Sequence, residues 1–297
     1  STLVRPATLA TVGALCIALA GEASALSRAD CERDYKPQVG QSGKDVVWVP
    51  TPDELVQRML KLARVTPQDT VYDLGAGDGK IAIAAGKIGA TSVGIEYNAD
   101  MAKLASCMVG AEGVSARTKV IQGDIFKEDF SKATVVTMYL LPELNLCVRH
   151  RLMAMKPGTR VTSHQFTMGD WEPDETSEVE YRTAYLWIVP ARVEGTWVLR
   201  DASGGSTSIE LKQTFQKLTG EVTAGAKRQP LVGATLRGDQ IKFAFNDDKG
   251  VTRTFNGTVR GNEMNGSFRS GNTDTKVTGT AQGALRKAEW AEILPQC

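Results

Sequence analysis

DLGAGDG, at residues 73–79, is the stretch from which the fold can be inferred. It directly follows the apolar run Val71–Leu74, which predicts a strand, and it begins a helical pattern. Glycines there let the backbone approach a ligand closely, and a helix N-terminus favours a negatively charged group. The dinucleotide fingerprint GxGxxG requires a third glycine at position 80, where this chain has Lys80. The stretch is therefore either a tight strand–helix turn or a ligand site of another kind.

On both sides of this stretch, from Thr70 to Phe166, short apolar runs alternate with helical patterns. Such alternation is typical of a parallel sheet with right-handed crossovers, so we expect a doubly wound α/β domain. The runs 178–181 and 184–189 predict an antiparallel hairpin after it. The expected strands are 71–74, 92–96, 119–122, 135–139 and 160–163, and the expected helices lie around 81–87, 99–109 and 144–155.

A further helix is expected to begin at the sequence TPDE, residues 51–54. Thr51 is suited to cap it, Pro52 fits the first helical position, and Glu54 completes a capping box. The apolar residues that follow recur at helical spacing, so one face of this helix is expected to pack against the domain.

The sequence changes character after Pro190. Apolar and polar residues alternate in short runs broken by Gly, Asn and Asp, as in IKFAF at residues 241–245. The stretches 247–250 and 260–262 predict hairpin turns. We therefore expect residues 192–297 to form an antiparallel meander, folded as a small barrel or curled sheet.

Three acidic residues stand at the ends of successive predicted strands. Asp73 follows the first strand, Glu96 ends the second, and Asp124 follows the third within Gly123-Asp124-Ile125. The carboxyl ends of parallel strands line one crevice, where open α/β sheets bind their ligands. There Glu96 is suited to accept ribose hydroxyls and Asp124 an adenine amino group, with Ile125 covering the ring.

Because all three acids occur at successive strand ends, about half of the chain resembles the class I S-adenosylmethionine-dependent methyltransferases. Residues 73–79 match the family's glycine-rich first motif, Glu96 its ribose acid and Asp124 its adenine acid. More closely, VPTPDELVQRML at 49–60 and VYDLGAGDGKIAIAAGK at 71–87 resemble bacterial relatives of the ATP synthase c-subunit lysine methyltransferases. The resemblance implies a Rossmann-like domain over residues 51–191, S-adenosyl-L-methionine as cofactor and a protein lysine as methyl acceptor. The cofactor-binding residues that it implies are Thr51, Asp73, Gly75, Ala76, Gly77, Asp78, Glu96, Gly123, Asp124 and Ile125.

The acceptor side is expected after the fourth strand, where the chain reads YLLPELN at residues 139–145. This is not the Asn/Asp-Pro-Pro-Tyr of nucleic-acid amino-methylases, and the net charge of +1 gives no general attraction to nucleic acid, so we expect no nucleic-acid partner. The catalytic candidates are Tyr139 and His164. Tyr139 either shapes the methyl-transfer channel or is an ordinary strand-end aromatic, and His164 either accepts a proton or is a hydrogen-bonded framework histidine. His150 is expected at the surface.

Two other functions stay open at this point. One is methylation of a small molecule, and the other is a non-catalytic exported binding protein on a methyltransferase scaffold. The intact Asp73, Glu96 and Asp124 argue against the second. The oligomeric state and the role of the β domain are not indicated by the sequence.

The first 25 residues have the pattern of a secretory signal peptide, which predicts an exported protein, periplasmic or secreted. Arg5 precedes an apolar run at 7–20 and a small-x-small site at 23–25. The run is shorter than the ~20 residues that a membrane span needs, so no stable span is expected. The alternatives are a buried N-terminal helix and an uncleaved segment that associates with a membrane. Residues 26–50 would then form a lead segment.

Removal of residues 1–25 leaves Cys31, Cys107, Cys147 and Cys297. With no CxxC and only two histidines, no zinc or other metal site is expected. Cys107 and Cys147 fall on helices predicted to cover opposite faces of the sheet, too far apart to pair, and both are expected to stay reduced. Cys31 and Cys297 lie in polar terminal segments, and we expect a disulfide between them in an oxidising compartment.

Overall fold

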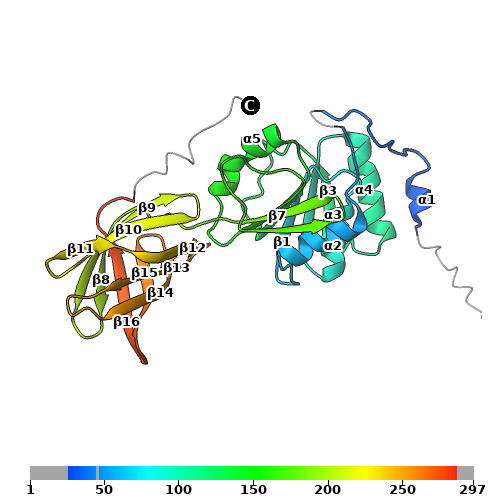
Figure 1. The fold of residues 1–297 in the computed structure, drawn as a ribbon. Helices are drawn as coiled ribbons and strands as arrows, with labels where there is room; N and C mark the ends of the chain where they lie inside the picture. The colour runs from blue at the N-terminus through cyan, green and yellow to red at the C-terminus, as the bar shows by residue number, and fades with distance from the viewer. Residues whose placement is uncertain (1–25, 45–46, 286–297) are drawn as a thin grey trace, which may run out of the picture.

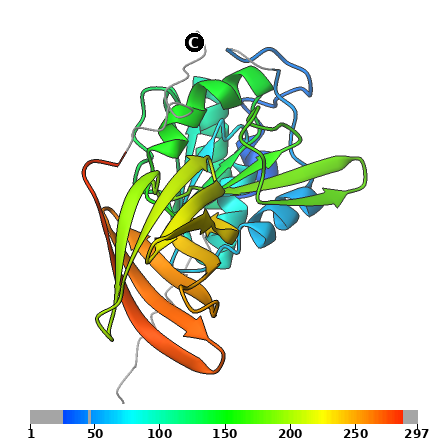
Figure 2. The same cartoon turned by 60° about the vertical axis from the view of Figure 1, so that its left-hand side comes forward.

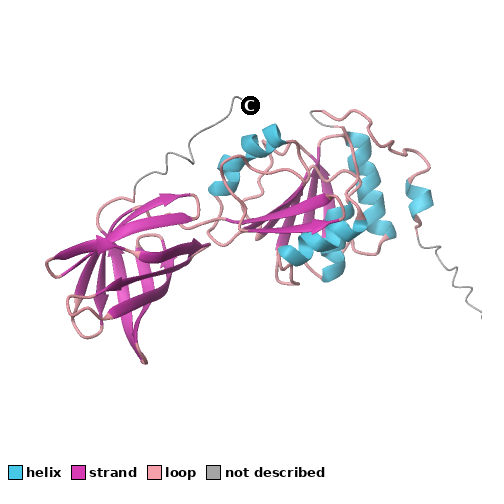
Figure 3. Cartoon of the chain, viewed as in Figure 1, coloured by secondary structure: helices cyan, strands magenta, loops and turns pink. Residues whose placement is uncertain are grey.

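The computed structural model describes residues 26–44 and 47–285, which form two β-sheets and the helices that cover the first of them (Figure 1; helices cyan and strands magenta in Figure 3). The first sheet has seven strands in the order β3-β2-β1-β4-β5-β7-β6. Neighbours among β1 to β5 are parallel, whereas β7 is antiparallel to β5 and β6 to β7. The strands are β1 (Thr70–Leu74), β2 (Thr91–Glu96), β3 (Thr118–Gln122), β4 (Val135–Met138), β5 (Arg160–His164), β6 (Glu175–Val179) and β7 (Arg182–Ile188).

Helices cover both faces of this sheet, so the predicted doubly wound α/β fold is confirmed. On one face Val71 and Val135 pack in the cluster that includes α2 and α3. On the other face Leu74 and Val136 pack in the cluster that includes α5 (Figure 1). The helices are α1 (Arg28–Cys31), α2 (Asp53–Leu62), α3 (Lys80–Ile88), α4 (Ala99–Ala111) and α5 (Pro142–Met153). No helix in the described ranges is long and apolar enough to span a membrane.

The second sheet is antiparallel throughout, with nine strands in the order β11-β10-β9-β8-β16-β15-β14-β13-β12. It curls on itself, as Figure 2 shows, so that its two end strands, β11 and β12, are consecutive in the chain. Leu231, which joins them, donates its amide to the carbonyl of Gly220 in β10 at 2.9 Å. Gly257 leaves room for the Phe255 ring, and Gly266, opposite it in register, lets the backbone of Asn256 and Gly257 approach closely. The strands are β8 (Gly195–Asp201), β9 (Ser206–Thr214), β10 (Lys217–Ala224), β11 (Lys227–Pro230), β12 (Val232–Arg237), β13 (Gln240–Asn246), β14 (Thr252–Arg260), β15 (Glu263–Ser270) and β16 (Thr273–Ala281).

The barrel interior is packed with side chains. Trp197, Phe243, Phe255 and Phe268 are buried in one apolar cluster, and Phe243 stacks on Phe255 with ring centroids 5.0 Å apart. Alternate residues of each strand supply this core, as the period-two pattern predicts. The predicted small antiparallel barrel is thereby confirmed.

The chain passes from the first sheet to the second through a buried connection. Val189, Ala191 and Val193 are all almost completely buried. The side chain of Gln213 donates to the carbonyl of Ala191 and accepts from the amide of Val193, each at 2.8 Å. Phe215 of the second sheet packs in the core of the first. The connection is therefore a packed junction.

The prediction that Thr51 caps a helix through a capping box is wrong. Helix α2 begins at Asp53 with Pro52 at the cap position, and no side chain in the described part of the chain caps it. Thr51 is buried, and its hydroxyl lies 3.1 Å from Nδ1 of His164. A buried histidine needs a hydrogen-bond partner, and Thr51 serves that need instead of the helix end.

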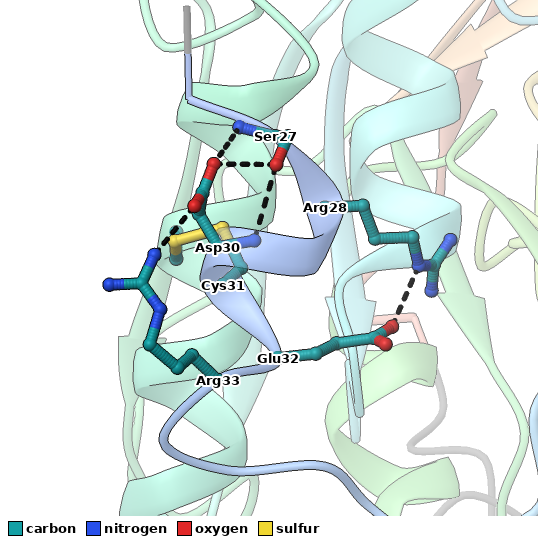
Figure 4. Close-up of a disulfide and its surroundings, with 7 residues drawn as sticks. Ser27, Arg28, Asp30, Cys31, Glu32 and Arg33 are labelled. Carbon is teal, nitrogen blue, oxygen red and sulfur yellow. Dashed lines mark hydrogen bonds and ion pairs between the residues drawn. A yellow bond between two sulfur atoms is a disulfide. The ribbon is translucent and has the colours of Figure 1, made fainter.

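The predicted cysteine pairing is also wrong. Cys31 forms a disulfide with Cys107, with their Cα atoms 5.6 Å apart (Figure 4). Cys147 is disulfide-bonded as well, so neither Cys107 nor Cys147 is reduced. The prediction failed because it treated the segment around Cys31 as a polar tail, whereas α1 packs against α4. Cys297 and the leader at residues 1–25 lie outside the described residues.

Candidate active site

A cavity of about 300 Å³ opens at the carboxyl ends of the first four strands. Its walls come from three parts of the chain: the loops after β1, β2, β3 and β4, the segment before α2 that ends at Thr51, and the loop after β5. The residues that line it include Lys44, Trp48, Val49, Pro50, Thr51, Asp73, Gly75, Ala76, Gly77, Asp78, Lys80, Glu96, Tyr97, Asp124, Ile125, Phe126, Tyr139, Leu140, Leu141, Leu144 and Phe166.

The glycine-rich loop after β1 forms the floor of the cavity. Gly75, Gly77 and Gly79 have φ of 76°, 55° and 81°, which residues with a Cβ rarely adopt. The amides of Gly75 and Ala76 donate to the carbonyl of Ile95 at 2.9 and 3.0 Å. The loop is thus folded against β2, and helix α3 begins immediately after it.

Two aspartates at this place are buried, Asp73 at the end of β1 and Asp78 in the loop. Asp73 is 1% exposed and accepts a hydrogen bond from the hydroxyl of Thr137 at 2.6 Å, while its other carboxylate oxygen has no hydrogen-bond partner among the described residues. Burial, together with the nearby Asp78 and Glu96 carboxylates, raises the pKa of Asp73 to about 7 against the opposing effect of the Thr137 hydrogen bond. Burial also raises the pKa of Asp78, whose carboxylate lies 3.6 Å from the guanidinium of Arg28.

Glu96 stands at the end of β2 and faces the same loop. Its carboxylate accepts from the amide of Gly77 at 2.8 Å and from the amide of Asn98 at 2.9 Å. Burial raises the pKa of Glu96, and these two hydrogen bonds oppose the shift. Asp73, Asp78 and Glu96 therefore form a cluster of negative charge whose ionised state a bound cation would stabilise.

Asp124 lines the cavity from the loop after β3. Its carboxylate accepts from the amide of Phe126 at 2.9 Å, which lowers its pKa, and it pairs with the ammonium group of Lys44 at 3.2 Å. That ammonium group also lies 4.6 Å from the centre of the Tyr97 ring. Ile125 lines the cavity beside Asp124, whereas Gly123 is not among the lining residues.

The far end of the cavity is apolar. Leu140, Leu141, Leu144 and Phe166 line it together with Tyr139. Burial raises the pKa of Tyr139, so its hydroxyl stays protonated at neutral pH. An acceptor group that enters here leaves water and meets mostly hydrocarbon.

The two catalytic candidates are in contact, but only Tyr139 lines the cavity. The ring of His164 stacks on that of Tyr139 with centroids 3.7 Å apart, and His164 itself is 1% exposed. Burial lowers the pKa of His164 to about 4, so it is neutral at pH 7. His164 is hydrogen-bonded to Thr51 through Nδ1, and its ring packs on the Tyr139 ring outside the cavity. His150 is exposed, as predicted.

The donor set fits the cofactor that the sequence implies. S-adenosylmethionine carries a positive sulfonium and an ammonium group, and the buried oxygen of Asp73 that has no partner offers an acceptor beside the loop. Glu96 and Asp124 supply carboxylates on two further walls of the cavity. The apolar side chains of Ile125 and Phe126 also line the cavity and offer a surface for a flat ring.

Comparison with known proteins gives the family. Residues 73–175 match the model of the ANTKMT methyltransferase domain. A protein-lysine N-methyltransferase of Saccharolobus islandicus is 42% identical over 151 residues, which are 48% of this chain and 94% of that relative. This chain belongs to the ANTKMT methyltransferase family. It is an enzyme with S-adenosylmethionine as its cofactor, as the sequence predicted.

Other relatives of this methyltransferase match it over a similar part. The adenine nucleotide translocase lysine N-methyltransferase of Mus musculus is 32% identical over 46% of this chain, and the match spans 56% of that relative. A solved structure described as an RNA methyltransferase from Salinibacter ruber in complex with S-adenosyl-L-homocysteine is 47% identical over 49% of this chain and 96% of that one, with a TM-score of 0.48.

Several residues of the methyltransferase site were not predicted from the sequence. Lys44 and Trp48 come from the lead segment, and Tyr97 and Phe126 each follow a predicted acid. The signal for Trp48 was the apolar run that leads into VPTP, from which no part of the site was inferred. The loop residue Phe166 had no signal, because only the fold brings it beside Tyr139, at 6.1 Å between ring centroids.

Proposed function

We propose that this methyltransferase transfers the methyl group to a lysine amine of a protein. The observation that carries the proposal is the apolar end of the cavity, lined by Leu140, Leu141 and Phe166 around the Tyr139 ring. A long aliphatic side chain with a terminal amine fits such a channel. The lysine methyltransferases among its relatives support the same acceptor.

The residues of the chain have three tasks in this reaction. The glycine-rich loop, Glu96 and Asp124 would hold the cofactor, which supplies an electrophilic methyl group. The channel positions the lysine for in-line attack, and positioning of two reactants is worth several kcal/mol of the barrier. Water is kept from the lysine stem by the leucines.

A lysine acceptor must first lose its proton, because its ordinary pKa is ~10.4. Desolvation in the apolar channel lowers that pKa, as does approach to a cationic cofactor. Tyr139 stays protonated and His164 is buried behind it, so neither is placed as a strong base. The proton leaves to solvent before the amine enters, and Tyr139 orients the neutral amine.

Methyl transfer tests the proposal directly. The full chain, supplied with S-adenosylmethionine carrying a deuterated methyl group, is incubated with three separate acceptor pools: protein from the native host, its RNA and its small metabolites. We expect labelled methyl-lysine in the protein pool, located by mass spectrometry, and its loss when the acceptor lysine is changed to arginine. Label in RNA or metabolites instead would contradict the lysine proposal. Tight cofactor binding with no label in any pool would favour a binding protein.

We also propose that the protein is exported by its leader and acts in an oxidising compartment. The Cys31–Cys107 disulfide and the second disulfide at Cys147 support this, because such bonds persist mainly outside the reducing cytosol. Intact mass of the protein from its native host is the test. We expect a mass that begins near Leu26 in an exported fraction, and a soluble cytosolic product that retains residues 1–25 would contradict export.

A further inference from the structure

Trp48, in the lead segment, lies against the glycine-rich loop. Its indole lies so close to Gly77 that a Cβ on that glycine would be 2.8 Å from Nε1. Trp48 lines the cavity and is half-buried, and no hydrogen bond among the described residues uses its Nε1. An aromatic face and an N–H donor are therefore presented at the wall of the cofactor cavity.

The position of Trp48 is set by the polypeptide before it. The amide of Trp48 donates to the carbonyl of Gln41 at 2.9 Å, and its carbonyl accepts from the amide of Gly40 at 2.8 Å. The side chain of Gln41 in turn donates to the hydroxyl of Tyr35 at 2.5 Å. Trp48 is thus connected, bond by bond, to Tyr35.

Tyr35 belongs to the part of the lead segment that is fixed to α4. It packs with Trp48 and the disulfide cysteines against Met101 and Leu104 of α4. The disulfide is the one covalent cross-link between the lead segment and α4 among the described residues. Figure 4 shows it beside the capped turn of α1. The ion pair of Arg28 with Asp78 joins α1 to the glycine-rich loop itself.

Without the disulfide, the arm formed by residues 26–44 would be held to the domain by side-chain packing and by ion pairs. Helix α1 has four residues, too few to be stable alone, and its ion pairs are largely exposed and therefore weak. A cross-link lowers the entropy of the separated state, so it favours the docked arm over the free one. The docked arm is what brings Trp48 to Gly77.

We propose that Trp48 is a further cofactor-binding residue of this methyltransferase, and that the Cys31–Cys107 disulfide positions it. The disulfide acts through Tyr35 and Gln41 and does not touch the cavity. A dithiol reductant converts the bond to two thiols and is itself oxidised to a disulfide. Cofactor affinity therefore depends on the oxidation state of a bond outside the site.

The first test is calorimetric titration of the full chain with S-adenosylhomocysteine, before and after reduction, with free thiols counted by mass spectrometry. We expect at least five-fold weaker binding once Cys31 and Cys107 are reduced. The variant Cys31→Ser/Cys107→Ser should bind as weakly as the reduced protein and should not respond to the reductant. A reductant response that persists in this variant would come from the disulfide at Cys147 and would overturn the proposal. Unchanged affinity in the reduced wild type would overturn it equally.

The second test addresses Trp48 itself. We expect Trp48→Ala to bind S-adenosylhomocysteine at least ten-fold more weakly, with a melting temperature close to that of the wild type. Trp48→Phe should restore most of the affinity but should lose the tryptophan fluorescence change on binding, because that change reports on the Trp48 indole. Tyr181→Ala is the matched control, since Tyr181 is 92% exposed at the hairpin between β6 and β7. Wild-type affinity in Trp48→Ala, or an undiminished fluorescence change in Trp48→Phe, would contradict the role of Trp48.

Discussion

At the scale of single residues, the site is governed by carboxylates held away from water. Asp73 has its pKa raised to about 7 by burial, and one of its oxygens has no partner. Glu96 and Asp124 instead use their oxygens on backbone amides and on Lys44. A cationic group of the ligand would therefore favour the ionised form of Asp73.

The affinity for S-adenosylmethionine should therefore rise with pH. The folded pKa of Asp73 lies above its ordinary value, so the fold prefers the protonated form, and ionisation between pH 6 and pH 8 favours a cationic ligand. We expect about ten-fold tighter binding at pH 8 than at pH 6 by calorimetry, since the ionised fraction rises by that factor around a pKa of 7. Equal affinity at the two pH values would contradict this assignment.

Asp73→Asn separates binding from stability. The raised pKa means that Asp73 stabilises the fold below its ordinary pKa of 3.8 and that this contribution is lost as pH rises through about 7. At pH 8 we expect the variant to melt at a higher temperature than the wild type, while binding becomes weak and insensitive to pH. A lower melting temperature at pH 8 would show that the charge of Asp73 is not a cost to the fold.

Glu96→Ala and Asp124→Ala should each weaken cofactor binding by roughly 1–3 kcal/mol, the scale for losing hydrogen bonds to a charged group. Calorimetry measures the change, and thermal melting shows whether each variant is folded. Wild-type affinity in both variants would rule out the proposed ribose and adenine contacts.

At the scale of elements, the loop between β1 and α3 does the positioning, and its glycines are needed for two reasons. Gly77 combines a φ of 55° with the close approach of Trp48, whereas Gly113 after α4 has a φ of 68° and open space around it. Both Gly77→Ala and Gly113→Ala should lose about 1 kcal/mol of stability from the backbone. Only Gly77→Ala should also weaken cofactor binding, by ten-fold or more. Equal binding in the two variants would refute the contact between Gly77 and Trp48.

The elements themselves were largely predictable, because periodicity and turn residues are local signals. The strands after Thr70, the glycine-rich loop and the hairpin of β6 and β7 were predicted to within a few residues. Thr51 and Cys31 were not, because their partners, His164 and Cys107, are distant in sequence. Pairing across the fold follows from packing, which the pattern of one segment does not encode.

At the scale of the whole molecule, the two sheets are joined through a buried seam. Phe215 of the barrel is 3% exposed and stacks on Trp171 of the methyltransferase domain with ring centroids 6.1 Å apart. Lys217 pairs with Glu172 at 2.6 Å, and Arg237 pairs with Glu175 across the same seam. The barrel was predicted from the alternation of apolar and polar residues in its strands. The seam was not predicted, because the sequence around Phe215 does not distinguish an aromatic residue of the barrel core from one that packs on the other sheet.

Phe215→Ala should open the seam. Truncation of a buried phenylalanine costs about 3–5 kcal/mol, and here the loss falls on the contact between the sheets. We expect limited proteolysis to cut near residues 189–194 in the variant but not in the wild type, where Val189 and Val193 are buried. Tyr181→Ala, which removes an exposed aromatic, should resist as the wild type does. Cleavage of the wild type at the same site and rate would contradict a packed junction.

The measurement that tests the central claim most directly is a calorimetric titration of the full oxidised chain with S-adenosylmethionine at pH 8. We predict one binding event per chain, competed by S-adenosylhomocysteine and reduced in Glu96→Ala. A flat titration for folded protein with its disulfides intact would contradict the assignment of this cavity as the cofactor site.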